Sequence, residues 1–338
     1  MRGKVRLGVI GLGWAGREHL KGYLKCGNAE PIAICDFDKD LLREVATTYN
    51  VRKTYTDYRE LLADEDIDAV SICLPNYLHC PVTVEALDAG KHVICEKPPA
   101  LNAEEAQLMA DRAEENGKIL MYAMVMRFSS STKFVKKLAV KGEFGEIYLG
   151  KASYVRRRGI PIGKGGWFVD KSRSGGGALI DIGVHALDCV WYLMGSPKPA
   201  SVSGSAYSKF GHTVPKKIKY DVDDAAFGLI KFENGATLYV EATWALNQPG
   251  EGTKLIAGTK GGARLDPLTI YTERDGVQLD ITPTVKNENP FEGETSHFVE
   301  CILKRKEPIA SAREGVTLMR MLDAIYESAR TGKEVPMS

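Results

Sequence analysis

The sequence predicts two domains: an α/β domain with a doubly wound parallel sheet over residues 1–124, and an α+β domain with a mainly antiparallel sheet over residues 125–338. Residues 4–123 alternate short apolar runs with helix-like stretches, which is typical of a parallel sheet flanked by helices. A Gly-x-Gly-x-x-Gly segment follows the first apolar run. From about residue 146 onward, strand-like runs separated by turn sequences replace this alternation.

Composition and charge narrow the classes of function. The chain has 338 residues, enough for two domains of roughly 150 residues each. It has 45 Lys and Arg against 44 Asp and Glu, and this net charge of +1 argues against a nucleic-acid or anionic-membrane partner. No apolar run approaches the roughly 20 residues of a membrane span. The first residues also lack the pattern of a signal peptide, so we expect a cytoplasmic protein.

The seven cysteines form no Cys-x-x-Cys pair, and their number is odd. Most stand among apolar neighbours, as Cys35 and Cys73 do. We interpret them as small buried residues in a reducing compartment, so neither a structural zinc nor a disulfide framework is expected.

The first domain is expected to alternate strands and helices in a fixed order. The expected strands are 5–10, 31–36, 69–74, 92–95 and 119–123, and the expected helices are 14–25, 38–47, one that ends near 89–90, and 102–116. The helix 102–116 has the strongest end signals, because Asn102 is a good N-cap, Glu104 and Glu105 lie in the first turn, and Gly117 follows the end.

The glycine-rich segment lies between the first strand and the first helix, where it can bind a dinucleotide. Gly11 allows the tight turn, Gly13 lets a pyrophosphate approach the backbone, and Gly16 allows the helix to pack on the strand. Asp36 lies at the end of the second strand and can accept hydrogen bonds from both adenosine ribose hydroxyls. This pattern favours NAD over NADP; the alternative is an ordinary turn with a surface Asp.

The second domain is expected to combine one buried helix with several hairpins. Residues 175–194 are predicted to form one helix that ends at Gly195, with an apolar stripe and a polar face. The polar face comprises Asp181, His185, Asp188 and Tyr192. Hairpin turns are predicted at 234–235, where Asn-Gly suits a type I′ turn, and at 275–276 and 259–262; helices are predicted at 295–304 and 313–330.

Two further segments strengthen the functional hypothesis. One contains Leu74-Pro75-Asn76-Tyr77-Leu78-His79 and, later, Glu96-Lys97-Pro98; the other is the run from Gly175 to His185. Together with the N-terminal glycines, they resemble the glucose–fructose oxidoreductase / inositol dehydrogenase (Gfo/Idh/MocA) family. The resemblance implies a Rossmann domain, a second domain with a large open sheet that binds substrate and forms oligomers, and nicotinamide-dependent redox chemistry on sugars or cyclitols.

The resemblance also assigns candidate catalytic residues, Lys97, Asp181 and His185. Lys97 follows a strand at the carboxyl edge of the sheet, and it can stabilise alkoxide character on a substrate oxygen. The peptide bond to Pro98 is commonly cis in the family. His185 is a natural proton acceptor beside Asp181, four residues earlier. No metal site is expected, because further ligands at suitable spacing are not visible.

The candidate residues form two binding sets, one for the cofactor and one for the substrate. The cofactor-binding set is Gly11, Leu12, Gly13, Trp14, Ala15, Asp36, Leu74, Asn76, His79, Glu96 and Lys97. The substrate-binding set is Lys97, Arg127, Arg156, Trp167, Asp181 and His185. Several have a structural alternative: Asn76 and His79 as helix caps, Trp167 as a core residue, and the basic run at Arg156 as a solvated loop rather than a contact for an acidic or phosphorylated sugar. Met126 stands where the family commonly has an Asn before Arg127.

These observations favour an NAD-dependent dehydrogenase acting on a sugar or cyclitol in a cleft between the two domains. One alternative uses tightly held NAD for transient ring oxidation with no net redox change. Another is a sugar or nucleotide sensor, which would be expected to lose part of the set Lys97, Asp181 and His185. The open sheet and the family both favour a homodimer or homotetramer.

Overall fold

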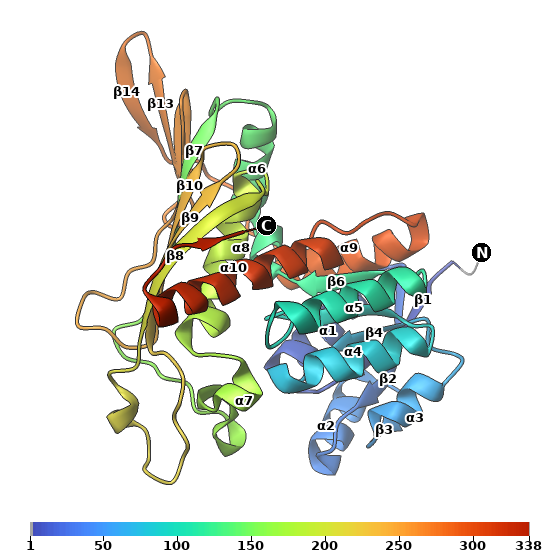
Figure 1. Cartoon of the computed structure of the whole chain (residues 1–338). Coiled ribbons are helices and arrows are strands. Elements are labelled where there is room, and N and C mark those ends of the chain that lie inside the picture. Colours follow the sequence, from blue (N-terminus) through green and yellow to red (C-terminus); the bar gives the residue numbers. More distant parts are fainter. Residues whose placement is uncertain (1–2, 338) are drawn as a thin grey trace. The chain divides into compact units, whose positions relative to one another are not determined.

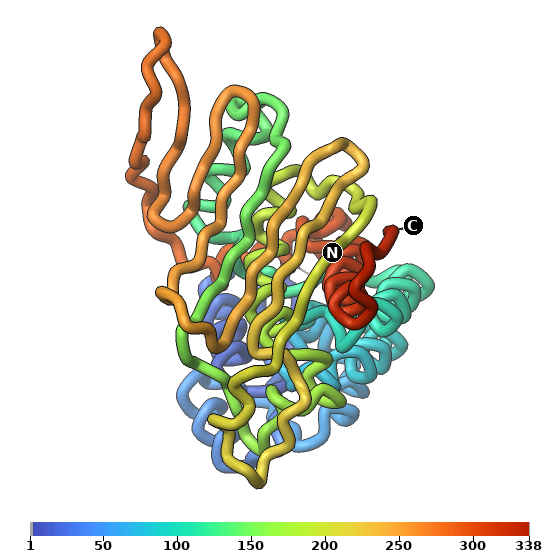
Figure 2. Tube along the Cα trace, turned by 60° about the vertical axis from the view of Figure 1, so that its left-hand side comes forward, coloured from blue at the N-terminus to red at the C-terminus, as the bar shows by residue number. Residues whose placement is uncertain are grey.

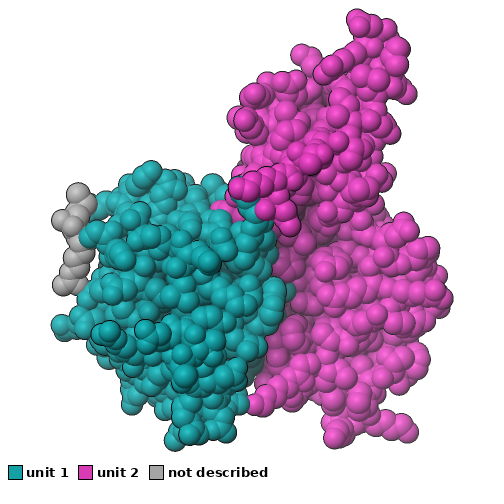
Figure 3. All heavy atoms as spheres, turned by 180° about the vertical axis from the view of Figure 1, so that it is seen from behind, with its two compact units in different colours: residues 1–125, 288–317 teal, residues 126–287, 318–338 magenta. Residues whose placement is uncertain are grey.

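The computed structural model describes residues 3–337, and the chain folds into two compact units (Figure 3). Unit 1 comprises residues 1–125 and 288–317, and unit 2 comprises residues 126–287 and 318–338. The segment 288–317, which the sequence analysis assigned to the second domain, belongs to unit 1. Its helix packs against the first helix of the chain, where Gly22 approaches Thr295 so closely that a Cβ on Gly22 would lie 2.3 Å from Thr295 Oγ1.

Unit 1 is built on a six-stranded, wholly parallel sheet in the order β3-β2-β1-β4-β5-β6 (Figure 1). The strands are β1 (Val5–Ile10), β2 (Ala29–Cys35), β3 (Lys53–Tyr55), β4 (Ala69–Ile72), β5 (His92–Glu96) and β6 (Leu120–Ala123). The α-helices are α1 (Trp14–Lys25), α2 (Lys39–Tyr49), α3 (Tyr58–Ala63), α4 (His79–Asp88), α5 (Ala103–Glu115) and α9 (Pro290–Lys304). Short 3₁₀ turns are η1 (Asn76–Leu78) and η2 (Val125–Phe128), the second of which leads into unit 2. The predicted doubly wound fold is confirmed, and β3 and α3 add to the expected elements.

Local sequence explains most boundaries in unit 1. Strand β1 is buried on both faces apart from Arg6, as expected for a parallel sheet covered by helices. Asn102 caps α5 as predicted, because its side chain accepts the Glu105 N–H at 2.9 Å. The strand order reverses between β1 and β4, and open α/β sheets bind their ligands at such a switch point.

Unit 2 is built on a nine-stranded open sheet in the order β14-β13-β12-β11-β7-β10-β9-β8-β15 (Figure 2). All neighbours are antiparallel except β7 and β10. The strands are β7 (Ile147–Val155), β8 (Pro199–Tyr207), β9 (Ala225–Phe232), β10 (Thr237–Thr243), β11 (Lys254–Gly258), β12 (Gly261–Arg264), β13 (Thr269–Arg274), β14 (Val277–Ile281) and β15 (Val335–Pro336). The predicted large, mainly antiparallel sheet is confirmed.

Helices cover one face of this sheet. The helical elements of unit 2 are α6 (Ser130–Val140), η3 (Lys164–Val169), α7 (Lys171–Ser174), η4 (Leu179–Gly183), α8 (Val184–Leu193), η5 (Gly211–Thr213) and residues 318–331 of α10 (Ala312–Thr331). Gly150 of β7 meets Val190 and Met194, and Gly228 of β9 meets Ile325. The alternating burial along β9 and β10 follows from this one-sided cover.

The three predicted hairpins are present, but the turn type at Asn234-Gly235 is wrong. Four residues separate β9 from β10, and Gly235 alone has positive φ (85°), whereas a type I′ turn needs positive φ at both central residues. That geometry occurs instead between β13 and β14, at Asp275 (φ 53°) and Gly276 (φ 75°).

Within residues 3–337, none of the helices is both long and apolar enough to span a bilayer.

Candidate active site

The glycine-rich turn of unit 1 combines tight packing with one open position. Gly11 has a φ of 89°, and a Cβ there would lie 2.3 Å from the Cys73 carbonyl oxygen. A Cβ on Gly16 would lie 1.9 Å from the Gly11 carbonyl oxygen. By contrast, at Gly13, immediately before α1, no described residue beyond its two chain neighbours has a heavy atom within 4 Å of the Cβ position. The open position leaves the backbone accessible at a helix N-terminus, as diphosphate binding requires.

Asp36 links this turn to the end of β2. Its Oδ2 accepts the Leu12 N–H at 2.8 Å, and its Oδ1 accepts the Asp38 N–H at 3.0 Å. Both oxygens are therefore fixed in orientation, and each retains acceptor capacity for a ribose hydroxyl. Trp14, the first residue of α1, is 66% exposed, and its indole packs edge-on against Phe291.

The loop after β4 is fastened to the segment after β5 by His79. This side chain is fully buried, and its Nδ1 and Nε2 each lie 2.7 Å from a carbonyl oxygen, of Pro98 and Leu74 respectively. The ring is thus placed to hold Leu74 and the backbone beside Lys97 in position. Asn76 is also buried, at the start of η1.

Glu96 and Lys97 lie at the carboxyl end of β5. The Glu96 carboxylate accepts the Lys97 N–H at 3.0 Å and approaches the buried His19 ring at 3.4 Å. The Lys97–Pro98 peptide is cis, as the family resemblance implied. The Lys97 side chain is half-buried. His19 was absent from the sequence-based candidates, because a lone histidine on the face of α1 gives no signal of its neighbour at the end of β5.

The predicted helix 175–194 is interrupted in the structure. Gly175 ends α7 in the left-handed region (φ 83°), and helical structure resumes only beyond Gly177. Residues Leu179–Gly183 then form a π-helical turn, η4, before α8 begins. A π-turn is rare and is frequently found at functional sites. Here Gly183 lies against β10, where an added Cβ would come within 2.8 Å of Ala242 Cβ.

This helical segment exposes two side chains. From Gly176 to Trp191, every residue is buried except Asp181, in the π-turn, and His185, in the first turn of α8. Both are partly exposed, so a carboxylate and an imidazole are the groups that the segment presents to a ligand. Asp181 also has a partner that sequence analysis missed: the fully buried Trp244 donates its indole N–H to Asp181 Oδ2 at 3.0 Å. Trp244 follows β10 directly, and nothing in its local sequence distinguishes it from a core tryptophan.

Arg127 has a different environment from the expected one. Its side chain is 1% exposed and makes a bidentate ion pair with Asp188, at 2.6 and 2.9 Å. The guanidinium also lies over the Tyr192 ring. This structure therefore places Arg127 in the core of unit 2 rather than at a substrate site, and it shows that the predicted polar face of the helix is partly an internal network.

The other two substrate candidates lie in loops of unit 2. Arg156 is partly exposed at the end of β7 and bonds to the Gly159 carbonyl, while Arg158 bonds to Leu246 and Asn247. These bonds favour a loop-stabilising role for the basic run. Trp167 is half-buried, and its ring stacks on Phe168 with centroids 3.8 Å apart. Lys97 belongs to unit 1, whereas Asp181, His185, Arg156 and Trp167 belong to unit 2.

The chain is similar to known proteins over nearly its whole length. It is 34% identical to D-glucoside 3-dehydrogenase of Escherichia coli (strain K12), over 98% of this chain and 97% of that protein. It is 28% identical to scyllo-inositol 2-dehydrogenase (NAD(+)) of Bacillus subtilis (strain 168), over 100% and 97% of the two chains. The solved structure of levoglucosan dehydrogenase in complex with NADH and levoglucosan superposes with a TM-score of 0.86 at 26% identity, covering 98% of this chain and 99% of the other.

Two family descriptions match consecutive parts of the chain. Residues 5–124 match the oxidoreductase family with an NAD-binding Rossmann fold, and residues 132–264 match the GFO/IDH/MocA C-terminal domain. These matches include the glycine-rich turn, Asp36 and Lys97 in the first part, and Asp181 and His185 in the second. The chain therefore belongs to the Gfo/Idh/MocA family of NAD-binding oxidoreductases.

Proposed function

We propose that this protein is an NAD-dependent dehydrogenase that oxidises a secondary hydroxyl of a sugar or cyclitol ring. The observation that carries the proposal is the pair Asp181 and His185, the two accessible side chains in an otherwise buried helical segment of an NAD-binding oxidoreductase. A base and a carboxylate so placed suit the removal of a hydroxyl proton and the binding of a neighbouring hydroxyl.

The residues of unit 1 fit a dinucleotide. The open backbone at Gly13 would receive the diphosphate, and Asp36, fixed by the Leu12 N–H, would accept the ribose hydroxyls. Leu74, Asn76 and Glu96 complete the set that we assign to the cofactor, with His79 supporting the loop behind them. When bound, NAD supplies the hydride acceptor.

Three side chains would contact the hydroxyl groups of the substrate. His185 accepts the hydroxyl proton, because an imidazole nitrogen is a common general base. Lys97 donates a hydrogen bond to the same oxygen and stabilises its developing negative charge. Asp181, itself held by the Trp244 indole, binds a neighbouring hydroxyl. Lys97 comes from unit 1, and the other two residues come from unit 2.

The names of the relatives suggest which substrates to test first. They are a D-glucoside 3-dehydrogenase, a scyllo-inositol 2-dehydrogenase and a levoglucosan dehydrogenase. All three names indicate ring alcohols, and none indicates an acidic or phosphorylated sugar. The comparisons support neither a sugar sensor nor an enzyme without net redox change.

A panel of glucosides, anhydrosugars, inositols and free sugars, each supplied with NAD or NADP, tests the proposal. We expect NADH absorbance to rise with at least one neutral ring alcohol. A panel in which substrates are consumed without NADH formation, or bind without being consumed, would favour one of the two alternatives.

Cofactor preference should depend on Asp36. Asp36→Ala should weaken NAD binding by about 10- to 100-fold, because a hydrogen bond to a charged group contributes about 1.5–3 kcal/mol. It should also raise the ratio of kcat/KM for NADP to that for NAD. Asp36→Asn is the matched control, because it keeps an acceptor for the Leu12 N–H while removing the negative charge. A parent enzyme that already uses NADP as well as NAD would contradict this assignment.

The parent protein is expected to form oligomers. The sheet face opposite α8 carries Phe227, Leu229, Tyr239 and Leu255, and Leu229 is 41% exposed. Lys151, Lys231 and Glu241 lie on the same face, and a second copy of the chain could cover the apolar side chains among them. Light scattering at micromolar concentration should show a dimer or tetramer, and Leu229→Glu should shift the equilibrium towards monomer. A monomeric parent protein would refute the expectation.

A further inference from the structure

One carboxylate receives the backbone N–H groups at the start of the helical segment that carries Asp181 and His185. Asp223 Oδ1 accepts the Gly177 N–H at 2.7 Å, and Oδ2 accepts the Leu179 N–H at 3.0 Å. The Asp223 carbonyl oxygen accepts the intervening Ala178 N–H at 3.0 Å. A helix start leaves such donors without intrahelical partners, and a negative charge is favourable there. Asp223 thus acts as an N-cap from a distant part of the chain.

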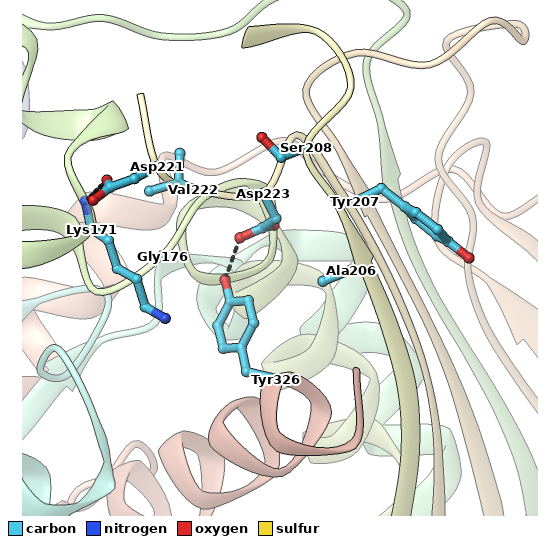
Figure 4. A pocket seen from close by; sticks show the side chains of 9 residues that line it. All are labelled: Lys171, Gly176, Ala206, Tyr207, Ser208, Asp221, Val222, Asp223 and Tyr326. Carbon is cyan, nitrogen blue, oxygen red and sulfur yellow. Dashed lines mark hydrogen bonds between the residues drawn. The ribbon is translucent and has the colours of Figure 1, made fainter. Parts of the chain in front are cut away.

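Tyr326 of α10 holds this carboxylate from the other side. Its hydroxyl donates to Asp223 Oδ1 at 2.7 Å, and Figure 4 shows the ring directed at the carboxylate. Asp223 is 7% exposed. Burial raises the pKa of this carboxyl group, and the bonds from Tyr326 and the two amides oppose that rise.

The two glycines before the helical segment make this approach possible. A Cβ on Gly176 would lie 2.2 Å from the Tyr326 hydroxyl, and a Cβ on Gly177 would lie 1.8 Å from the Asp223 carbonyl oxygen. The Gly177 carbonyl in turn accepts the N–H of Asp181 at 3.0 Å. The anchored residue is therefore bonded directly to one of the proposed catalytic residues.

Asp224, the residue after Asp223, supports Asp181 through Trp244. The Asp224 carbonyl accepts the Trp244 N–H at 2.8 Å, and the Trp244 indole donates to the Asp181 carboxylate at 3.0 Å. The dipeptide Asp223-Asp224 therefore fixes both the backbone and the side chain of Asp181, through Gly177 and through Trp244.

We propose that Asp223 and Tyr326 form a positioning pair that sets the π-turn and the first turn of α8, and with them Asp181 and His185, for proton transfer. The roles of Asp181 and His185 rest on the proposed function, whereas the anchoring of the helical segment does not. Neither Asp223 nor Tyr326 is among the residues assigned above to the cofactor or the substrate.

The anchoring is tested without substrate by comparing amide hydrogen exchange in the parent and in Tyr326→Phe. A pocket of about 230 Å³, lined in part by Gly176, Asp223 and Tyr326, lies beside the missing hydroxyl (Figure 4). Water can fill the space there, so the variant is expected to fold. Exchange should become faster in residues 177–184 and stay unchanged in unit 1. Unchanged exchange in 177–184 would overturn the proposal.

Tyr58→Phe is the matched control for the exchange experiment. It also removes a hydroxyl that donates to a carboxylate, that of Glu85 at 3.0 Å, but within unit 1. Exchange in 177–184 should be unaffected in this variant. Equal acceleration there in both variants would mean general loosening and would also overturn the proposal. Asp223→Asn keeps one acceptor oxygen, loses the charge, and should accelerate exchange in the same segment.

A double-mutant comparison of kcat distinguishes a positioning role from general destabilisation. With the best substrate from the panel, Tyr326→Phe should lower kcat by about 10- to 100-fold, the scale expected for a small misplacement of catalytic groups, and leave the NAD dissociation constant unchanged. In a His185→Ala background the further loss should be clearly smaller, because the positioned base is absent and only Asp181 remains to be misplaced. Equal losses in both backgrounds would contradict a positioning role. If the panel yields no substrate, the proposed function fails, and the exchange experiment still decides on the anchor.

Discussion

His185→Ala is expected to lower kcat by about 10²- to 10⁴-fold, the usual contribution of a positioned general base. The imidazole is one of two accessible side chains between Gly176 and Trp191, and its replacement removes the proposed proton acceptor. The NAD dissociation constant should stay at the parent value, because Gly13 and Asp36 belong to unit 1. Turnover on the best substrate and fluorescence titration with NAD measure the two quantities.

A histidine outside the site provides the control. His212 lies exposed in η5 of unit 2, and His212→Ala should leave both kcat and NAD binding unchanged. If His185→Ala keeps near-parent turnover with an intact fold, His185 is not the base, and Lys97 becomes the candidate.

Lys97→Ala is expected to lower kcat by about 10²- to 10³-fold, the scale for loss of one positioned electrostatic donor. Its backbone is fixed by Glu96 and by the His79 bond to the Pro98 carbonyl, so truncation should remove the ammonium group without moving the loop. The loss should appear in kcat more than in KM, because the charge on the substrate oxygen develops in the transition state.

An exposed lysine of the same unit serves for comparison. Lys25→Ala, at the end of α1, should behave as the parent. A Lys97→Ala variant with parent kcat and a raised KM would show that Lys97 binds the substrate equally in the ground and transition states, and it would contradict the proposed role.

Sequence reasoning succeeded where local signals act alone. Asn102 caps α5 through a bond to a residue three positions away, and the glycine-rich turn is recognised from its place between β1 and α1. The sequence signals for both features come from neighbours along the chain.

The remaining features depend on contacts between distant residues. The π-turn accompanies the packing of Gly183 on Ala242, and the Asp181–Trp244 bond joins positions 63 residues apart. Arginine is a residue type that can bind a substrate. Arg127 instead forms an ion pair with Asp188, which lies 61 residues later in the chain. Helix α9 has ordinary helical periodicity, which identifies a buried face but not the domain that it covers.

The most direct test of the central claim is the amount of NADH formed per molecule of substrate oxidised, measured together with the ketone product on the best substrate of the panel. We predict equal amounts of NADH and ketone throughout the reaction. Consumption of the substrate with no accumulation of NADH would contradict the account, because it would show that ring oxidation is transient and that the enzyme causes no net redox change.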